Sequence, residues 1–205
     1  MKVVAFNGSP HANGTVCAGI RTMGEELEKA GIELELVHVG GEAIRGCMAC
    51  GKCRALGKCV FDDDMVNECR DKANEADGII LGSPVYYGGV AGAFKSFLDR
   101  LFFPGVKLQY KVGAVVVSLR RSGGIAVFHQ LNNYLNLAQV IIAPSIYWEV
   151  IHGNNAQEFL QDEEGRHIMR TAGRNMAWLL KILLWGKRDW PYPAALPRAM
   201  TNFVH

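Results

Sequence analysis

Short apolar runs alternate along the chain with longer segments whose apolar residues recur every three or four positions. The runs at residues 3–6, 78–82 and 111–119 are almost continuously apolar, which is typical of strands buried on both faces of a parallel sheet. Residues 33–39 alternate polar and apolar positions, as an edge strand does, and residues 140–143 are the last strand candidate. The pattern therefore predicts five strands.

Helical periodicity fills the intervals between these runs, with helices predicted at residues 15–30 and 62–76 and three more toward the C-terminus. The predicted inward faces are Val16, Ile20, Met23 and Leu27; Met65, Val66, Cys69, Ala73 and Ala76; Phe94, Phe97, Leu98 and Leu101; Val127, Leu131, Tyr134, Leu135 and Ala138; and Ile168, Ala172, Met176, Leu179 and Leu183. Alternating strands and helices predict an α/β fold, a doubly wound five-stranded parallel sheet in a single domain of residues 1–205. Residues 40–61 form a long cysteine-rich loop in this scheme, and residues 185–205 form a tail.

Three loops follow predicted strands and should meet at the carboxyl edge of the sheet, where such folds bind ligands. The first, Asn7 to Gly14, leads into a helix N-terminus whose exposed N–H groups and dipole favour an anion such as phosphate. Ser9, Asn13 and Thr15 offer further donors. A generic strand, turn and capped helix would have the same appearance, so this alternative stays open.

The loops at residues 83–92 and 120–124 differ in character. Tyr86 and Tyr87, beside glycines, suit a flat conjugated ligand, although an exposed turn with one buried tyrosine would look similar. The string GGVAG is a weak dinucleotide signal after the wrong strand. His129 and Arg120 or Arg121 could approach a ligand near the third loop, or be solvated.

Composition narrows the class of protein. The chain has 205 residues, is 49% hydrophobic and carries a net charge of +2, which fits one cored domain and gives no basic excess for nucleic acid. We find no signal-peptide pattern and no apolar run of the ~20 residues that a membrane span needs, so a cytoplasmic protein without a membrane partner is expected. HExxH, GxSxG and Walker motifs are absent from the sequence, and the acidic residues 62–64 are interpreted as a helix N-terminus rather than a magnesium site.

Four of the six cysteines, Cys47, Cys50, Cys53 and Cys59, stand in the pattern C-x2-C-x2-C-x5-C. Cysteines at intervals of three, with small residues between them, let a short loop wrap a compact inorganic core, which favours a [4Fe-4S] cluster. Zinc, free thiols, a disulfide or a lost site remain alternatives. Cys17 and Cys69 are predicted to be core residues.

The strings GSPHANGT, the cysteine run ending in CVFDDDM, and SPVYYGGVAGAFKSFLDR together resemble the iron-sulfur flavoproteins of the NADPH-dependent FMN reductase superfamily. The resemblance implies a flavodoxin-like fold with strand order 2-1-3-4-5, FMN at the carboxyl edge, a [4Fe-4S] cluster on the four cysteines, and a homodimer or homotetramer. It assigns to FMN the residues Ser9, His11, Asn13, Gly14, Thr15 and Val16 near the phosphate, and Pro84, Val85, Tyr86, Tyr87, Gly88, Ser122, Gly123 and Gly124 around the ring. The family often has Arg or Lys where His11 stands here.

The leading functional expectation is an oxidoreductase that transfers electrons between the cluster and FMN, with ferredoxin or NAD(P)H as partner and no catalytic acid–base pair. One alternative is an NAD(P)H-dependent FMN or quinone reductase without a cluster. Another is a non-enzymatic flavodoxin-type carrier or metal-stabilised interaction module.

Overall fold

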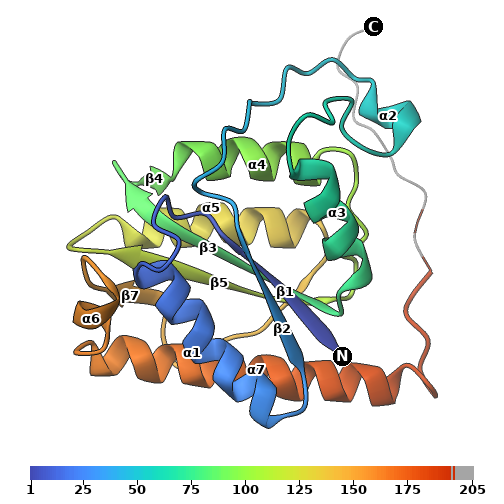
Figure 1. Ribbon diagram of the computed structural model, residues 1–205. Helices are drawn as coiled ribbons and strands as arrows, with labels where there is room; N and C mark the ends of the chain where they lie inside the picture. Colours follow the sequence, from blue (N-terminus) through green and yellow to red (C-terminus); the bar gives the residue numbers. More distant parts are fainter. Residues whose placement is uncertain (195, 197–205) are drawn as a thin grey trace, which may run out of the picture.

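A parallel sheet between two layers of helices forms the body of the computed structural model, which describes residues 1–194 and 196 (Figure 1). The strand order is β2-β1-β3-β5-β6, with every neighbouring pair along it parallel, so the predicted order 2-1-3-4-5 is confirmed. The strands are β1 (Lys2–Asn7), β2 (Glu33–His38), β3 (Gly78–Tyr86), β5 (Val112–Leu119) and β6 (Ile141–Ile142). Of the predicted tail, residues 195 and 197–205 lie outside the described part.

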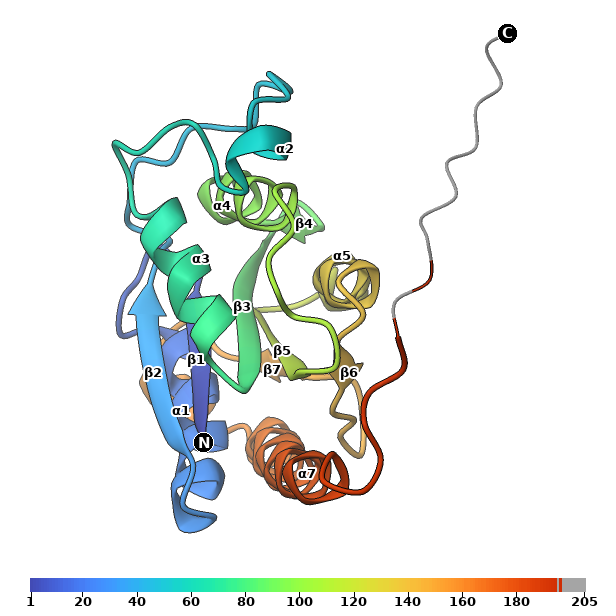
Figure 2. The ribbon, with the colours of Figure 1, turned by 90° about the vertical axis from the view of Figure 1, so that its right-hand side faces the viewer.

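Helices cover both faces of the sheet, as Figure 2 shows end-on. Val3 and Ala5 pack with α1 (Thr15–Lys29) and α7 (Glu163–Gly186) in one core. Val4 and Phe6 pack in the other core, with three helices on the opposite face. These are α3 (Val66–Glu75), α4 (Gly92–Phe102) and α5 (Gly124–Leu137). Successive residues of β1 point to opposite faces of the sheet, and helices cover both faces. For this reason residues 3–6 are all apolar.

The helix predicted to begin at residue 62 begins instead at Val66. The Asp64 carboxylate accepts a hydrogen bond from the Val66 N–H at 3.2 Å and pairs with Arg100 of α4. Its side chain therefore closes a turn before the helix, as Asp commonly does, and the prediction that residues 62–64 form the first helical turn was wrong.

The fifth strand is split in two. Ile141 and Ile142 pair with the start of β5, but Pro144 has no N–H to continue the ladder, and the chain leaves the sheet. It returns as β7 (Val150–His152), parallel to the carboxyl half of β5. The prediction of one strand at residues 140–143 missed this second piece, which brings residues 153–155 to the carboxyl edge.

The loop predicted at residues 83–92 is a tight hairpin. β3 continues to Tyr86 and pairs antiparallel with β4 (Gly89–Val90) through a two-residue turn at Tyr87 and Gly88. Both turn residues have positive φ, 49° and 72°, as a type I′ turn requires. The short helices α2 (Cys53–Leu56) and α6 (Ala156–Phe159) were not predicted. Among the described helices, none combines the length and apolarity needed to cross a membrane.

Candidate functional site

A cavity of about 760 Å³ opens at the carboxyl edge of the sheet, within the range of about 300–1,000 Å³ typical of small-molecule sites. Four segments line it, which lie at or just beyond the carboxyl ends of β1, β3, β5 and β7. They are Ser9, Pro10, His11, Ala12, Asn13, Gly14 and Thr15; Pro84, Val85 and Tyr86; Ser118, Leu119 and Arg120; and Gly153, Asn154 and Asn155. The convergence of separate loops on one edge, expected from the sequence, is present.

The loop after β1 is held in shape by its own side chains. Asn7 accepts from the Ser9 N–H at 3.0 Å and donates to the Ala12 carbonyl at 3.1 Å. The Ser9 hydroxyl accepts from the His11 N–H at 3.2 Å. Within the part of the chain that the structure describes, no side chain caps the N-terminus of α1, which begins after Gly14, so the first-turn N–H groups face the cavity without a side-chain partner there. This arrangement suits an anion.

Neighbouring strands support the same loop from behind. His38 at the end of β2 donates its Nε2–H to the Ser9 carbonyl at 2.8 Å, so this histidine is structural. A Cβ on Gly40 would lie 2.3 Å from the Ser9 carbonyl oxygen, so only glycine permits the close approach. The Thr15 hydroxyl donates to the Gly153 carbonyl at 3.1 Å and ties α1 to the segment after β7.

The residues that the resemblance assigned to FMN fall into two groups. Those from Ser9 to Thr15, and Pro84, Val85 and Tyr86, line the cavity. Val16 is buried behind it, whereas Tyr87, Gly88, Ser122, Gly123 and Gly124 lie at its margin or beyond it. Gly123 packs on the hairpin, because a Cβ there would lie 3.2 Å from a Val85 methyl carbon.

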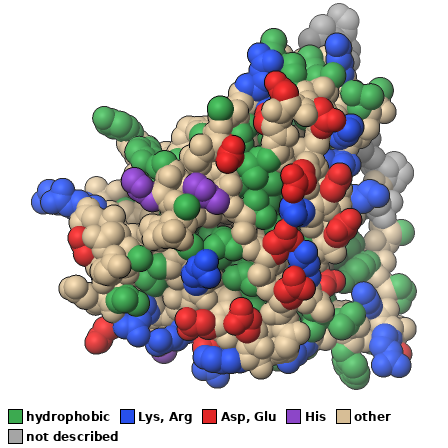
Figure 3. Space-filling view, in the orientation of Figure 1, with side chains coloured by type: hydrophobic (Ala, Val, Ile, Leu, Met, Phe, Trp, Pro, Cys, Tyr) green, Lys and Arg blue, Asp and Glu red, His purple; other side chains and the backbone are tan. Residues whose placement is uncertain are grey.

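Sequence reasoning missed two parts of the lining, Ser118 with Leu119 and the segment Gly153 to Asn155. The string HGNN after an apolar pair was the available signal for the second. The hairpin is the most exposed aromatic feature near the cavity: Tyr86 is 48% exposed and Tyr87 fully so. Figure 3 shows hydrophobic side chains projecting at this end of the molecule, and charges of both signs mixed over the rest of that face.

The four motif cysteines line a second pocket, between the cysteine-rich segment and the C-terminal end of α4. Cys47 and Cys50 are exposed, Cys53 is buried and Cys59 is partly buried. Positive φ at Ala49 (52°) and Gly51 (71°) turns the chain between successive cysteines. Within residues 1–194 and 196, no three His, Cys, Asp or Glu side chains lie close enough together to hold a metal ion, so the sulfurs share a pocket without forming a coordination set.

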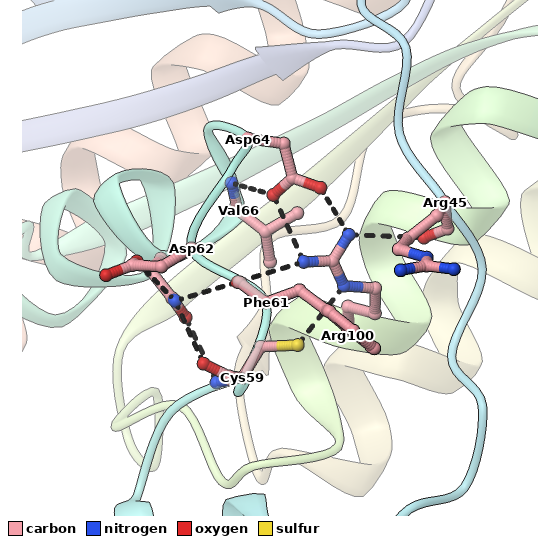
Figure 4. Close-up of polar contacts among 8 residues, drawn as sticks. Arg45, Cys59, Phe61, Asp62, Asp64, Val66 and Arg100 are labelled. Atoms are coloured by element: carbon pink, nitrogen blue, oxygen red, sulfur yellow. Dashed lines mark hydrogen bonds and ion pairs between the residues drawn. The ribbon is translucent and has the colours of Figure 1, made fainter.

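Arg100 of α4 reaches into this segment with a side chain that is 1% exposed. Its Nε–H donates to the Cys59 sulfur at 3.2 Å, and its two terminal nitrogens donate to the Phe61 carbonyl at 3.3 Å, to the Arg45 carbonyl at 3.2 Å and to both Asp64 oxygens (Figure 4). Burial alone lowers the pKa of the Arg100 guanidinium, and the bonds to Asp64 and Cys59 outweigh it, so the net pKa is raised. Asp64 is thus the counter-ion of a buried arginine.

Asn67 of α3 fixes the same cysteine through its backbone. Its carbonyl oxygen accepts from the Cys59 N–H at 3.0 Å, and its amide donates to the Cys59 carbonyl at 3.0 Å and to Phe61 and Asp62. Cys59 is therefore held at its N–H, its carbonyl and its sulfur. Sequence reasoning missed both Arg100 and Asn67; the available signal was an arginine three residues after Phe97, on the inward face of a helix.

Comparison with known proteins adds family evidence to this geometry. Residues 1–155 match the family described as NADPH-dependent FMN reductase. A protein of Methanocaldococcus jannaschii named "Iron-sulfur flavoprotein" is 33% identical over 192 residues, 89% of this chain and 99% of that protein. RosB, solved with bound 8-demethyl-8-formylriboflavin-5′-phosphate, superposes with a TM-score of 0.71 at 16% identity over 100% of this chain and 93% of its own. A flavodoxin from the Archaea gives a TM-score of 0.60 at 15% identity over 88% of this chain and 99% of its own, so the fold is flavodoxin-like.

Proposed function

Because this chain belongs to the NADPH-dependent FMN reductase family and is an FMN-dependent oxidoreductase of the iron-sulfur flavoprotein type, we propose that it passes electrons between a [4Fe-4S] cluster and FMN. The observation that carries the proposal is one chain with two separate pockets, one lined by a phosphate-type loop and the other by four cysteines. FMN supplies both one-electron and hydride transfer, so it can join a one-electron centre to NAD(P)H.

The carboxyl-edge cavity fits FMN on its own chemistry. The first-turn N–H groups of α1, with Ser9, His11 and Asn13, would bind the phosphate. Pro84, Val85 and the hairpin would lie along the ring, where apolar and aromatic walls suit a flat conjugated system. RosB, which has the same fold, was solved with a bound flavin phosphate, so a ligand of this class is compatible with the fold. The protein's part is to bind and orient, and no acid–base pair is required.

The cysteine pocket fits a cluster by its donor set. Four thiols and no His, Asp or Glu line it, which is the ligand type of iron–sulfur clusters and of some zinc sites. The exposed Cys47 and Cys50 lie on irregular backbone outside any helix or strand, so they can close on a cluster held by Cys53 and Cys59. We further propose a cytoplasmic homodimer or homotetramer that uses ferredoxin or NAD(P)H.

Purification without air, with iron, sulfide and flavin quantified beside an absorption spectrum, tests the proposal. We expect about four irons and four sulfides per chain, as one [4Fe-4S] cluster requires, and one FMN. Cys59→Ser should lose most of the iron. Cys69→Ala is the matched control, because burial raises the pKa of the Cys69 thiol to about 12 and keeps it protonated in the core, so iron should be retained.

Two other results would each select a different function. Protein that lacks iron and sulfide but oxidises NAD(P)H steadily would be an FMN or quinone reductase without a cluster. Folded protein that binds neither flavin nor iron would be an interaction module.

A further inference from the structure

We infer that Arg100 is a positioning and tuning residue for the cluster: it holds the Cys59 sulfur in place and raises the cluster's reduction potential, while Asp64 limits that effect. The inference rests on the proposed function, because it concerns the same cysteine pocket. It goes beyond that proposal in assigning roles to two residues outside the cysteine motif.

Among the described residues, the side-chain hydrogen bonds of Arg100 all go to one segment. Their acceptors are in Arg45, Cys59, Phe61 and Asp64, between residues 45 and 64, although Arg100 itself belongs to α4. Its guanidinium carbon also lies 5.6 Å from the Phe61 ring centroid, and that of Arg45 lies 4.3 Å from the same ring. The side chain therefore organises the chain around the fourth cysteine.

A purely structural need does not explain a buried arginine at this position. Burying an ion pair costs desolvation that an apolar pair of similar volume avoids, and such replacements are often neutral or stabilising. The surrounding helix face is apolar: Phe97 and Leu101 are completely buried, and Arg100 is buried between them. An ionic residue retained among them points to a role in the site.

The N–H···S contact supplies the chemical reason. Hydrogen bonds to ligand sulfurs and nearby charge are among the determinants of iron–sulfur potentials. The Arg100 Nε lies 3.2 Å from the Cys59 sulfur and donates a hydrogen bond to it. The guanidinium would also bring a permanent positive charge beside the cysteine thiolates that hold a cluster. Both effects favour the reduced, more negative form of a cluster. Asp64 opposes the charge from the other end of the guanidinium.

Two variants with opposite expected signs test the inference. Arg100→Met removes the donor and the charge, so the midpoint potential of the cluster should fall. A fall of about 59 mV would shift the one-electron equilibrium between cluster and FMN about tenfold toward FMN, and we expect a change of this size. Asp64→Asn keeps the shape and can still accept from the Val66 N–H, but it leaves the Arg100 charge unopposed, so the potential should rise. Potentials are read by mediated spectroscopic titration without air.

If Arg100 had only a structural role, both variants would lose iron. The potential of the remaining clusters would then be unchanged, or would shift in the same direction in both variants. That outcome would overturn the inference. Arg100→Met combined with Asp64→Asn leaves no unpaired buried charge and keeps the test valid if the single variants fold poorly; its potential should still lie below that of the wild type. Lys95→Met, on the exposed side of α4, is the control and should leave the potential unchanged.

A metal-free readout separates this inference from the proposed function. In protein stripped of metal, Arg100→Lys should speed hydrogen exchange at residues 57–64 at least tenfold, because a single ammonium cannot replace the forked contacts. Unchanged exchange would contradict the positioning role. Wild-type protein that never binds iron would defeat the proposed function while leaving this measurement interpretable.

Discussion

At the scale of single residues, the loop after β1, where we propose that the FMN phosphate binds, contains neither lysine nor arginine between residues 8 and 14. The His11 ring stands at the exposed lining, while its N–H and carbonyl close the loop through Ser9 and Gly14. Arg120, at the end of β5, lines the same cavity two strands away from β1. This loop therefore offers an anion the N–H donors and the dipole of α1, without a permanent positive charge of its own.

His11→Arg should tighten FMN binding about two- to fivefold, the range of exposed charge interactions of about 0.5–1 kcal/mol. The reason is a permanent charge added beside the phosphate without a change to the backbone contacts. Flavin fluorescence titration measures the affinity, and riboflavin, which has no phosphate, is the control. An equal gain for riboflavin would show that the effect is not phosphate recognition.

Glu149 gives the chain a pH dependence of stability. It is 4% exposed, and burial raises its pKa to about 7 despite backbone N–H groups that partly offset the effect. The folded chain thus binds a proton that the unfolded chain has released, so the stabilisation is complete at low pH and is lost as pH rises to about 7. Each pH unit between the ordinary pKa of 4.5 and the raised value of about 7 contributes about 1.4 kcal/mol, so the loss is on the order of 3 kcal/mol.

Glu149→Gln should remove that dependence, because the amide does not titrate. Urea unfolding at pH 5, 6 and 8 should show the wild type losing stability relative to the variant as pH rises. A constant difference between the two proteins across this range would count against the buried, protonated carboxyl.

At the scale of elements, the β3–β4 hairpin carries an aromatic residue in a costly conformation. Tyr87 has φ of 49° and is fully exposed, so its ring contributes nothing to the core. Asn is favoured at the first position of a type I′ turn before glycine. A strained, exposed tyrosine beside the carboxyl-edge cavity, where we propose that FMN binds, indicates a role in the site.

Tyr87→Asn should therefore stabilise the flavin-free protein by about 1 kcal/mol and weaken FMN binding about three- to tenfold, the value of an aromatic contact. Thermal unfolding and flavin titration measure the two effects. Tyr110, with φ of 64° and away from the cavity, is the matched control: Tyr110→Asn should leave FMN affinity unchanged. Unaltered affinity in Tyr87→Asn would mean that the ring does not contact flavin.

The elements also show how far the sequence could be used. Apolar runs such as 3–6 and 78–82 predicted the central strands, because burial on both faces leaves a direct pattern, whereas the strand order was implied by the family resemblance. The fifth strand is split at Pro144 because its pairing with β5 stops after Ile142. The helix begins only at Val66 because Asp64 forms an ion pair with Arg100 of α4. Both are contacts between distant segments, which periodicity does not encode.

The candidate sites follow the same division. The loop after β1 and the cysteine spacing are local motifs and could be identified from the sequence, and the residues lie in two pockets. Asn67, Arg100 and Gly153 contact the residues of these motifs only through the fold, because they lie 8, 41 and 138 residues away along the chain from Cys59, Cys59 and Thr15 respectively.

At the scale of the whole molecule, α7 leaves an apolar stripe uncovered. Trp178, Ile182 and Trp185, spaced by four and three residues, share one face and are 62%, 41% and 69% exposed. The opposite face, with Ala172 and Met176, is buried on the sheet. Contiguous exposed apolar surface of this kind is typical of protein interfaces, and it supports the proposed homo-oligomer.

Trp178→Ser with Trp185→Ser should at least halve the apparent mass at micromolar concentration, measured by light scattering after size exclusion, with FMN content retained. Trp190→Ser, 81% exposed and beyond the end of α7, is the control and should leave the mass unchanged. A wild type that is monomeric at every concentration would remove the basis for this interface.

The same stripe has an optical consequence. All four tryptophans of the chain, Trp148, Trp178, Trp185 and Trp190, are exposed, and none of them is among the described residues that line the carboxyl-edge cavity or the cysteine pocket. The wavelength of tryptophan emission therefore reports on the exposure to water of Trp178 and Trp185 on α7, and of Trp148 and Trp190 outside it. Dilution that separates subunits should move the emission to longer wavelength, while cofactor loading should leave that wavelength in place, so one spectrum follows assembly independently of the redox centres.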